Sequence, residues 1–168
     1  MEEKEILVSQ EGYNKLEADL DYLKTIKRTE IAEKIKVALG YGDLSENSEY
    51  DEAKTAQTDN ERKIAELEDK IAELENKIRH AKIIDESEIN TKNVQVGNIV
   101  KLYNDMMKQE VVFTIVGPTE VDLAENKISN ESPIGKALLG KKKNEIAEAV
   151  LDNGEVLKFK VLKISFGL

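Results

Sequence analysis

A long heptad pattern in the middle of the chain limits its fold more than any other feature. Mostly apolar residues alternate there at spacings of three and four: Tyr50, Ala53, Gln57, Asn60, Ile64, Leu67, Ile71, Leu74, Ile78 and Ala81. Such a repeat predicts a helix that packs along its length against another helix. The predicted helix covers residues 45–84 and would be about 60 Å long at 1.5 Å per residue. A helix of that length requires an extended partner.

The partner is predicted in the preceding segment. Ser9 is a suitable N-cap, and apolar residues then follow at helical spacing: Tyr13, Leu16, Leu20, Leu23, Ile31, Ile35 and Ala38. Lys27 falls on this stripe, either as a local weakness or as a side chain that snorkels to solvent. Gly40 and Gly42 disfavour helix and supply the positive φ that a turn needs, so the first helix should end there. Two long helices joined by a short turn predict an antiparallel hairpin.

The two halves of the predicted helix–helix seam differ in side-chain size. Ile and Leu occupy the seam from Ile64 onward, whereas Ala53, Gln57 and Asn60 occupy it nearer the turn. Burying small or polar side chains releases less free energy than burying Leu. We therefore expect a narrow, mobile distal end and a firmer proximal seam.

After Asp85 the pattern changes to short apolar runs separated by polar residues. Residues 86–93 suit a linker, and four runs predict strands at Ile99–Tyr103, Glu110–Val116, Val150–Leu151 and Val156–Ser165. Asn153-Gly154 predicts a type I′ hairpin turn. Ser132–Gly140 predicts a two-turn helix with a Ser cap, an initial Pro and a Gly after its end. The fold class is therefore predicted to be α+β, with a helical hairpin at residues 1–84 and a β-rich domain at residues 85–168.

The composition excludes several classes of function. The net charge is −9 over 168 residues, so binding to nucleic acid without a partner protein is not expected. The chain has no Cys and a single His, His80, which excludes a disulfide framework, a thiol nucleophile and a zinc site of the common kinds. The acidic N-terminus precedes only a three-residue apolar run. We expect neither a signal peptide nor a membrane span, and a cytoplasmic location.

The predicted turn concentrates carboxylates at the projecting end of the hairpin. Asp43, Glu46 and Glu49 are spaced three apart, which would bring them onto neighbouring positions of a helix beginning there. Such carboxylates could hold Mg²⁺ loosely, with water or a partner completing the coordination. Asp43 and Glu46 also have the spacing of an N-terminal capping box. The residues alone favour the capping role.

Other residues near the turn have two interpretations. Tyr41 could stack on a nucleobase or pack across the turn. Lys54 lies just past the turn, and Lys24, Lys27 and Arg28 lie on one side of the first helix. These cations could contact RNA, but a solvated face that pairs with nearby acids is the favoured interpretation.

Several motifs resemble the Gre family of bacterial transcript-cleavage factors, its GreA branch more closely than its GreB branch. The motifs are Gly12 with Lys15-Leu16, Tyr22-Leu23-Lys24, the turn Gly42-Asp43-Leu44-Ser45-Glu46-Asn47-Ser48-Glu49-Tyr50, Ile128-Ser129-Asn130, and Ser132 to Lys142. They occur in both predicted domains. At the positions before the turn motif, where the family commonly has Arg-Glu, this chain has Leu39 and Gly40.

The resemblance implies a fold, a partner and a reaction. The coiled coil would enter the secondary channel of bacterial RNA polymerase, and a C-terminal domain with an FKBP-like fold would dock at the rim of that channel. Asp43 and Glu46, with Glu49 as a further candidate, would help to hold a Mg²⁺ ion shared with the polymerase. The polymerase would then cleave backtracked nascent RNA, so the chain would be a monomeric factor and not itself an enzyme.

Two alternatives to this function remain open. One is a Gre-like paralogue that occupies the channel and inhibits the polymerase, against which Asp43 and Glu46 argue. The other is a coiled-coil chaperone or a prolyl isomerase built on the C-terminal domain. Tyr103, Phe113, Phe159 and Phe166 are the aromatic residues of that domain, which is poor material for an apolar proline pocket.

Overall fold

The computed structural model describes residues 4–40 and 47–167, with only the backbone for several residues between 34 and 60. The chain forms two compact units. One unit combines Met1–Tyr13 with His80–Leu168, and the other is Asn14–Arg79. The predicted boundary between residues 84 and 85 assumed that each domain is one continuous stretch of the chain. In the structure, Met1–Tyr13 instead belongs to the unit that contains the large sheet.

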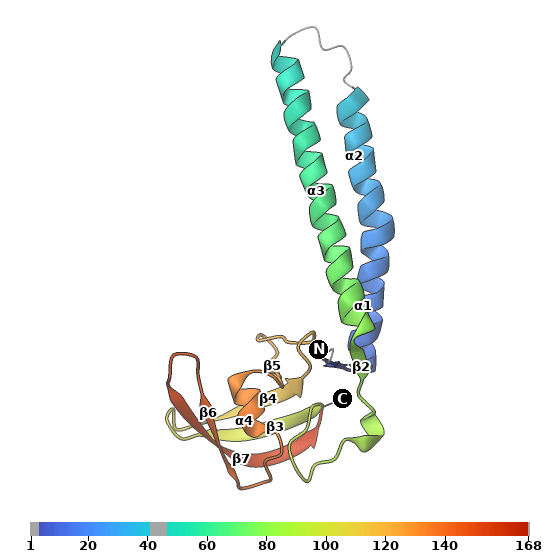
Figure 1. Cartoon of the computed structure of the whole chain (residues 1–168). Helices are drawn as coiled ribbons and strands as arrows, with labels where there is room; N and C mark the ends of the chain where they lie inside the picture. Colours follow the sequence, from blue (N-terminus) through green and yellow to red (C-terminus); the bar gives the residue numbers. More distant parts are fainter. Residues whose placement is uncertain (1–3, 41–46, 168) are drawn as a thin grey trace. The chain divides into compact units, whose positions relative to one another are not determined.

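The hairpin consists of two long helical segments that lie side by side (Figure 1). The first comprises α1 (Gln10–Tyr22), a π-helical turn η1 (Leu23–Lys27) and α2 (Arg28–Gly40), and the second is α3 (Asn47–Arg79). Ser9 caps α1 as predicted, because its Oγ accepts a hydrogen bond from the Gly12 N–H at 3.0 Å. α2 is described as far as Gly40, and the predicted stop near Gly40 and Gly42 adjoins residues 41–46, which lie outside the described residues.

The seam of the hairpin is formed by the larger apolar residues of the predicted stripes. Ile31, Leu67 and Ile71 are buried, and Leu20, Leu23 and Ile64 pack against them. Lys24 pairs with Glu75, which lies beyond Ile71 on α3, so the two segments run antiparallel. The predicted apolar packing of the proximal seam is therefore present, whereas the side chains of Ala53, Gln57 and Asn60 lie outside the described residues, so the difference between the two halves stays a prediction.

A small parallel sheet pairs the residues just before the first helical segment with the residues just after the second. Strand β1 (Ile6–Val8) pairs with β2 (Ala81–Ile83), with Ile6 opposite Ala81. The Ile6 N–H donates to the His80 carbonyl at 2.9 Å. The prediction that the second helix continues through Ala81 to Ile84 is wrong, because these residues satisfy their backbone groups in a strand pair and not in a further helical turn.

The larger sheet has the strand order β5-β4-β3-β7-β6. Its strands are β3 (Asn98–Asn104), β4 (Gln109–Val116), β5 (Lys127–Ser129), β6 (Ile146–Val150) and β7 (Val156–Phe166), and all neighbours are antiparallel except β4 and β5. A short helix, α4 (Pro133–Leu138), contributes Leu138 to the core. The fully buried core residues include Leu102, Ile115 and Phe159. The α+β fold class is confirmed.

Two details of the sheet correct the predictions. The strand expected at Val150–Leu151 lies earlier, at Ile146–Val150, where Ala147 and Ala149 face the core and hydrophilic or exposed residues alternate with them. The turn after it is not type I′, since Gly154 has a positive φ of 83° but Asn153 does not. The Gly154 N–H donates to the Leu151 carbonyl, which is typical of a longer hairpin loop with glycine in the left-handed position.

Candidate functional site

The hairpin places the acidic motif between its two long helical segments. α2 is described up to Gly40 and α3 from Asn47, so residues 41–46 connect the end of α2 to the start of α3. The candidates Tyr41, Asp43 and Glu46 lie in this connection, outside the described residues. Glu49 and Lys54 lie on the first turns of α3, where only the backbone is described.

The cationic candidates on the first segment are partly engaged with acidic residues. Lys24 Nζ lies 2.5 Å from Glu75 Oε1, and Lys27 Nζ lies 3.6 Å from Glu30 Oε2. The hydrogen bond from Lys24 and its positive charge lower the pKa of Glu75. Arg28 is exposed at the start of α2. These pairs follow the solvated-face interpretation, while RNA contact by the same cations stays a prediction.

The π-helical turn is a local feature that the sequence interpretation did not identify. Thr25 and Thr29 donate their hydroxyls to the carbonyls four residues earlier, at 2.7 and 2.8 Å. Ile26 is 52% exposed within this turn. Two signals in the sequence could have indicated an irregular helix here. They are the threonines, whose hydroxyls can bond to the helix backbone, and Lys27 on the apolar stripe.

The Ser132–Gly140 motif has a clear structural role in the sheet-containing unit. Ser132 Oγ accepts from the Gly135 N–H at 3.1 Å and donates to the Ser129 carbonyl at 2.6 Å. A β carbon at Gly135 would overlap the Ser129 carbonyl. Gly140 has a φ of 78° just past the helix. The predicted cap, initial proline and terminal glycine of α4 are therefore confirmed.

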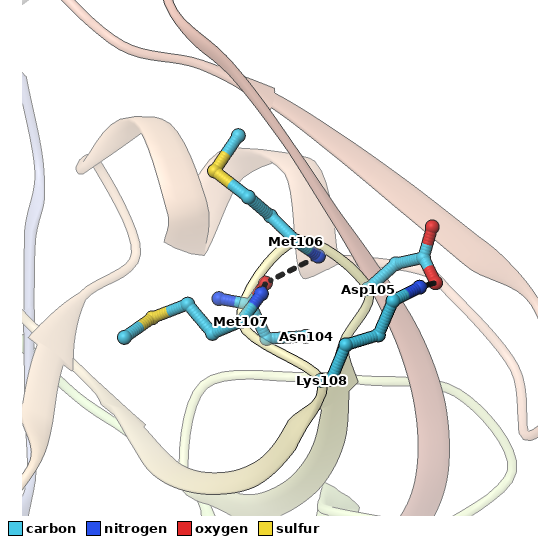
Figure 2. Close-up of polar contacts among 5 residues, drawn as sticks. All are labelled: Asn104, Asp105, Met106, Met107 and Lys108. Carbon is cyan, nitrogen blue, oxygen red and sulfur yellow. Dashed lines mark hydrogen bonds and ion pairs between the residues drawn. The ribbon is translucent and has the colours of Figure 1, made fainter.

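The turn between β3 and β4 carries two exposed methionines, Met106 and Met107 (Figure 2). Asn104 is buried, and its Oδ1 accepts from the N–H groups of Met106 and Met107 at 3.0 and 3.1 Å. Asp105 pairs with Lys108 at 2.8 Å, and this hydrogen bond and the positive charge of Lys108 lower the pKa of Asp105. Met106 and Met107 are thus held on a turn braced by its own side chains.

Among the residues that the structure describes, no group of three or more His, Asp or Glu side chains is arranged to hold a metal ion. The predicted metal ligands Asp43 and Glu46 lie outside the described residues, and only the backbone of Glu49 is described. No described helix is both long enough and apolar enough to cross a membrane.

Comparisons with known proteins identify both parts of the chain. Residues 6–83 match the family "Transcription elongation factor, N-terminal", and residues 89–166 match "Transcription elongation factor, GreA/GreB, C-term". The transcription elongation factor GreA of Clostridioides difficile strain 630 is 52% identical over 163 residues, which cover 97% of this chain and 98% of that protein. GreA of Thermoanaerobacter pseudethanolicus is 50% identical over 161 residues, with 96% and 98% coverage.

A solved GreA/GreB structure from Nitrosomonas europaea aligns with 98% of this chain and 100% of its own, at 21% identity and a TM-score of 0.41. A protein with a helical hairpin and a separate sheet-containing unit thus matches transcription elongation factors along nearly its whole length. The chain belongs to the GreA/GreB family of transcription elongation factors. This confirms the resemblance, and membership of this family implies RNA polymerase as the partner.

Proposed function

We propose that this chain inserts its helical hairpin into the secondary channel of bacterial RNA polymerase and stimulates cleavage of backtracked nascent RNA. The observation that carries the proposal is the position of the acidic motif on the chain. Asp43 and Glu46 lie in the connection between two long antiparallel helices, within a chain whose relatives are elongation factors. The sheet-containing unit docks at the rim of the channel.

The role of the hairpin is delivery. α3 alone has 33 residues and would extend about 50 Å at 1.5 Å per residue, which gives the motif considerable reach. Burial of Ile31, Leu67 and Ile71 holds the two helical segments together, while a slim pair of helices can enter a channel that a globular domain cannot. The polymerase supplies the RNA and the remaining part of the active site.

The role of Asp43 and Glu46 is to provide carboxylate oxygens beside the acidic residues of the polymerase. Hard cations such as Mg²⁺ prefer oxygen ligands, and two carboxylates suit a shared site that neither protein completes alone. When bound there, Mg²⁺ supplies charge neutralisation at the phosphate and activation of water. Because the chain contributes ligands and no nucleophile, it acts as a factor and has no cleavage activity by itself.

Amide variants separate this role from helix capping. Asn caps a helix as well as Asp does, and Gln serves in a capping box as Glu does, so Asp43→Asn and Glu46→Gln keep the cap but remove the charge. With a stalled, backtracked polymerase and Mg²⁺, RNA shortening should slow by at least roughly tenfold, the effect of about 1.4 kcal/mol of lost transition-state stabilisation.

Asp69→Asn is the matched control, because Asp69 is an exposed acid on the regular part of α3. This variant should cleave at the parent rate. Full activity of both Asp43→Asn and Glu46→Gln would refute the proposed metal role and leave capping as the function of these residues.

A further inference from the structure

The first turn of α1 is held by a side chain from the loop that follows β4. Glu120 Oε2 accepts a hydrogen bond from the Ser9 N–H at 2.8 Å, and Glu120 Oε1 accepts one from the Ser9 hydroxyl. The Ser9 Oγ in turn accepts from the Gly12 N–H. The helix N-terminus carries a partial positive charge, so a carboxylate at this point is favoured electrostatically as well as by hydrogen bonding.

The cluster is closely packed and largely withdrawn from solvent. Ser9 is 4% exposed and Val8 is fully buried. A β carbon at Gly12 would overlap the Glu120 side chain, and one at Gly117 would overlap the Leu7 carbonyl. Both glycines therefore allow the loop of residues 117–120 to approach the backbone of β1 and the start of α1.

This contact acts on a helix that continues into the hairpin. The boundary between the two units falls between Tyr13 and Asn14, inside α1. The turn that Glu120 holds is therefore the start of the same continuous helix that carries Leu16 and Leu20. A change of about 10° in the direction of a rod as long as α3, roughly 50 Å, would move its far end by about 9 Å.

We infer that Glu120 is a positioning residue: it fixes the first turn of α1 and thereby restricts the directions that the hairpin can take from the unit containing the large sheet. The consequence for RNA cleavage rests on the proposed function. A restricted hairpin delivers Asp43 and Glu46 to a docked polymerase more often than a freely swinging one.

A distance measurement tests the restriction without polymerase. The chain has no Cys, so spin labels can be attached to a protein carrying Asp69→Cys on α3 and Asp152→Cys in the turn before β7. Glu120→Ala should broaden the distribution of label distances, and Glu120→Gln should broaden it less because the amide keeps one acceptor. Glu125→Gln, an exposed acid paired with Lys127, is the control and should leave the distribution unchanged.

Gly12→Ala provides an independent variant. In the parent chain its methyl group displaces the Glu120 carboxylate, so the label distances should broaden. In the Glu120→Ala background, Gly12→Ala should cause no further broadening, and alanine should favour the helix over glycine. The two substitutions are therefore expected to be non-additive.

The transcript-cleavage assay gives the functional arm. Glu120→Ala should lower stimulated cleavage by roughly tenfold, since small misplacement of reacting groups is enough to reduce rates strongly. Distance distributions of equal width in the parent and in a folded Glu120→Ala protein would overturn the inference. Failure of the parent chain to stimulate any cleavage would instead refute the proposed function and leave the distance result standing.

Discussion

Deletion of one residue from the π-helical turn should leave the hairpin intact. Ile26 is the best residue to remove, because it lies inside the turn and is half exposed. A π turn takes up one more residue than an α turn. Without Ile26, residues 10–40 should form an uninterrupted α-helix, and the same apolar residues should still face α3.

The rotation along the helix explains this expectation. Leu23 and Ile31 are eight residues apart, which in a regular α-helix would place Ile31 about 80° past two full turns. Both residues nevertheless lie in the one seam. Because the π turn accommodates one extra residue, the rotation from Leu23 to Ile31 equals that of seven residues in a regular α-helix, about 20° short of two full turns. Ile26 deletion keeps that rotation.

Deletion of Asp69 is the matched control, because this exposed residue lies on a regular α-helix between Leu67 and Ile71. It turns all later residues of α3 by about 100° relative to Leu67. Loss of one buried Leu or Ile side chain from the seam costs about 2 kcal/mol. For a unit of this size that lowers the melting temperature by about 8 °C or more.

Thermal unfolding followed by circular dichroism at 222 nm distinguishes the two deletions. The protein without Ile26 should melt within about 4 °C of the parent, a change below roughly 1 kcal/mol. The protein without Asp69 should melt clearly lower. Equal losses in the two deletions would refute the account of η1 as one extra residue that keeps Leu23 and Ile31 on the seam.

Three further predictions follow from local geometry. Gly154→Ala should lower the free energy of unfolding in urea by about 1 kcal/mol, because an L side chain is strained at the φ of 83°, and Gly154→Asn should lower it less. Ser132→Ala should also lower it by about 1 kcal/mol through loss of the α4 cap, with a smaller loss for Ser132→Asn. Lys24→Gln should raise the pKa of Glu75 toward its ordinary value in a carboxylate NMR titration. Because the pKa of Glu75 is lower in the folded state, the Lys24–Glu75 pair stabilises the fold at pH values above the unfolded-state pKa, and this stabilisation is lost as the pH falls through the folded-state pKa. A Glu75 pKa that does not change in Lys24→Gln would contradict Lys24 as the cause of the shift.

The hairpin was predictable because its signals are local and repeated. The stripe through Ile64, Leu67 and Ile71 follows from helical spacing alone. The π turn was not predictable from the stripe alone, since Lys27 could equally be a snorkelling residue on a regular helix. The π-helical turn Leu23–Lys27 shows the change of winding, and it lets Leu23 pack in the seam that contains the buried Ile31.

The strand pair β1–β2 depends on residues that are far apart in sequence. Ile6–Val8 is a short apolar run whose partner, Ala81–Ile83, continues the heptad spacing of α3 and so predicted helix. The turn at Asn153-Gly154 was assigned from a dipeptide preference, but the loop length decides its type. Glu120 carried no sequence signal, because its partner Ser9 lies 111 residues earlier.

The acidic residues of the motif were predicted from the sequence, and their proposed role comes from the family and not from their spacing. By position, Asp43 and Glu46 fit both a helix cap and a metal site, and the residues alone favour the cap. The amide variants are informative because they preserve one role and remove the other.

The buried residues of the seam and the Glu120 contact both lie away from Asp43 and Glu46 along the helices, so effects of the amide variants can be told apart from effects on folding. The described seam lies at Ile31 and toward α1, and Gly40 is about 14 Å further along α2 at 1.5 Å per residue. The Glu120 contact lies at the opposite end of the first helical segment, at its first turn. Substitutions at Asp43 and Glu46 therefore leave both the seam and the anchored helix start unchanged. A loss of RNA cleavage with an unchanged melting temperature would arise from the chemistry of the motif, whereas loss after substitution of Glu120 would arise from its delivery.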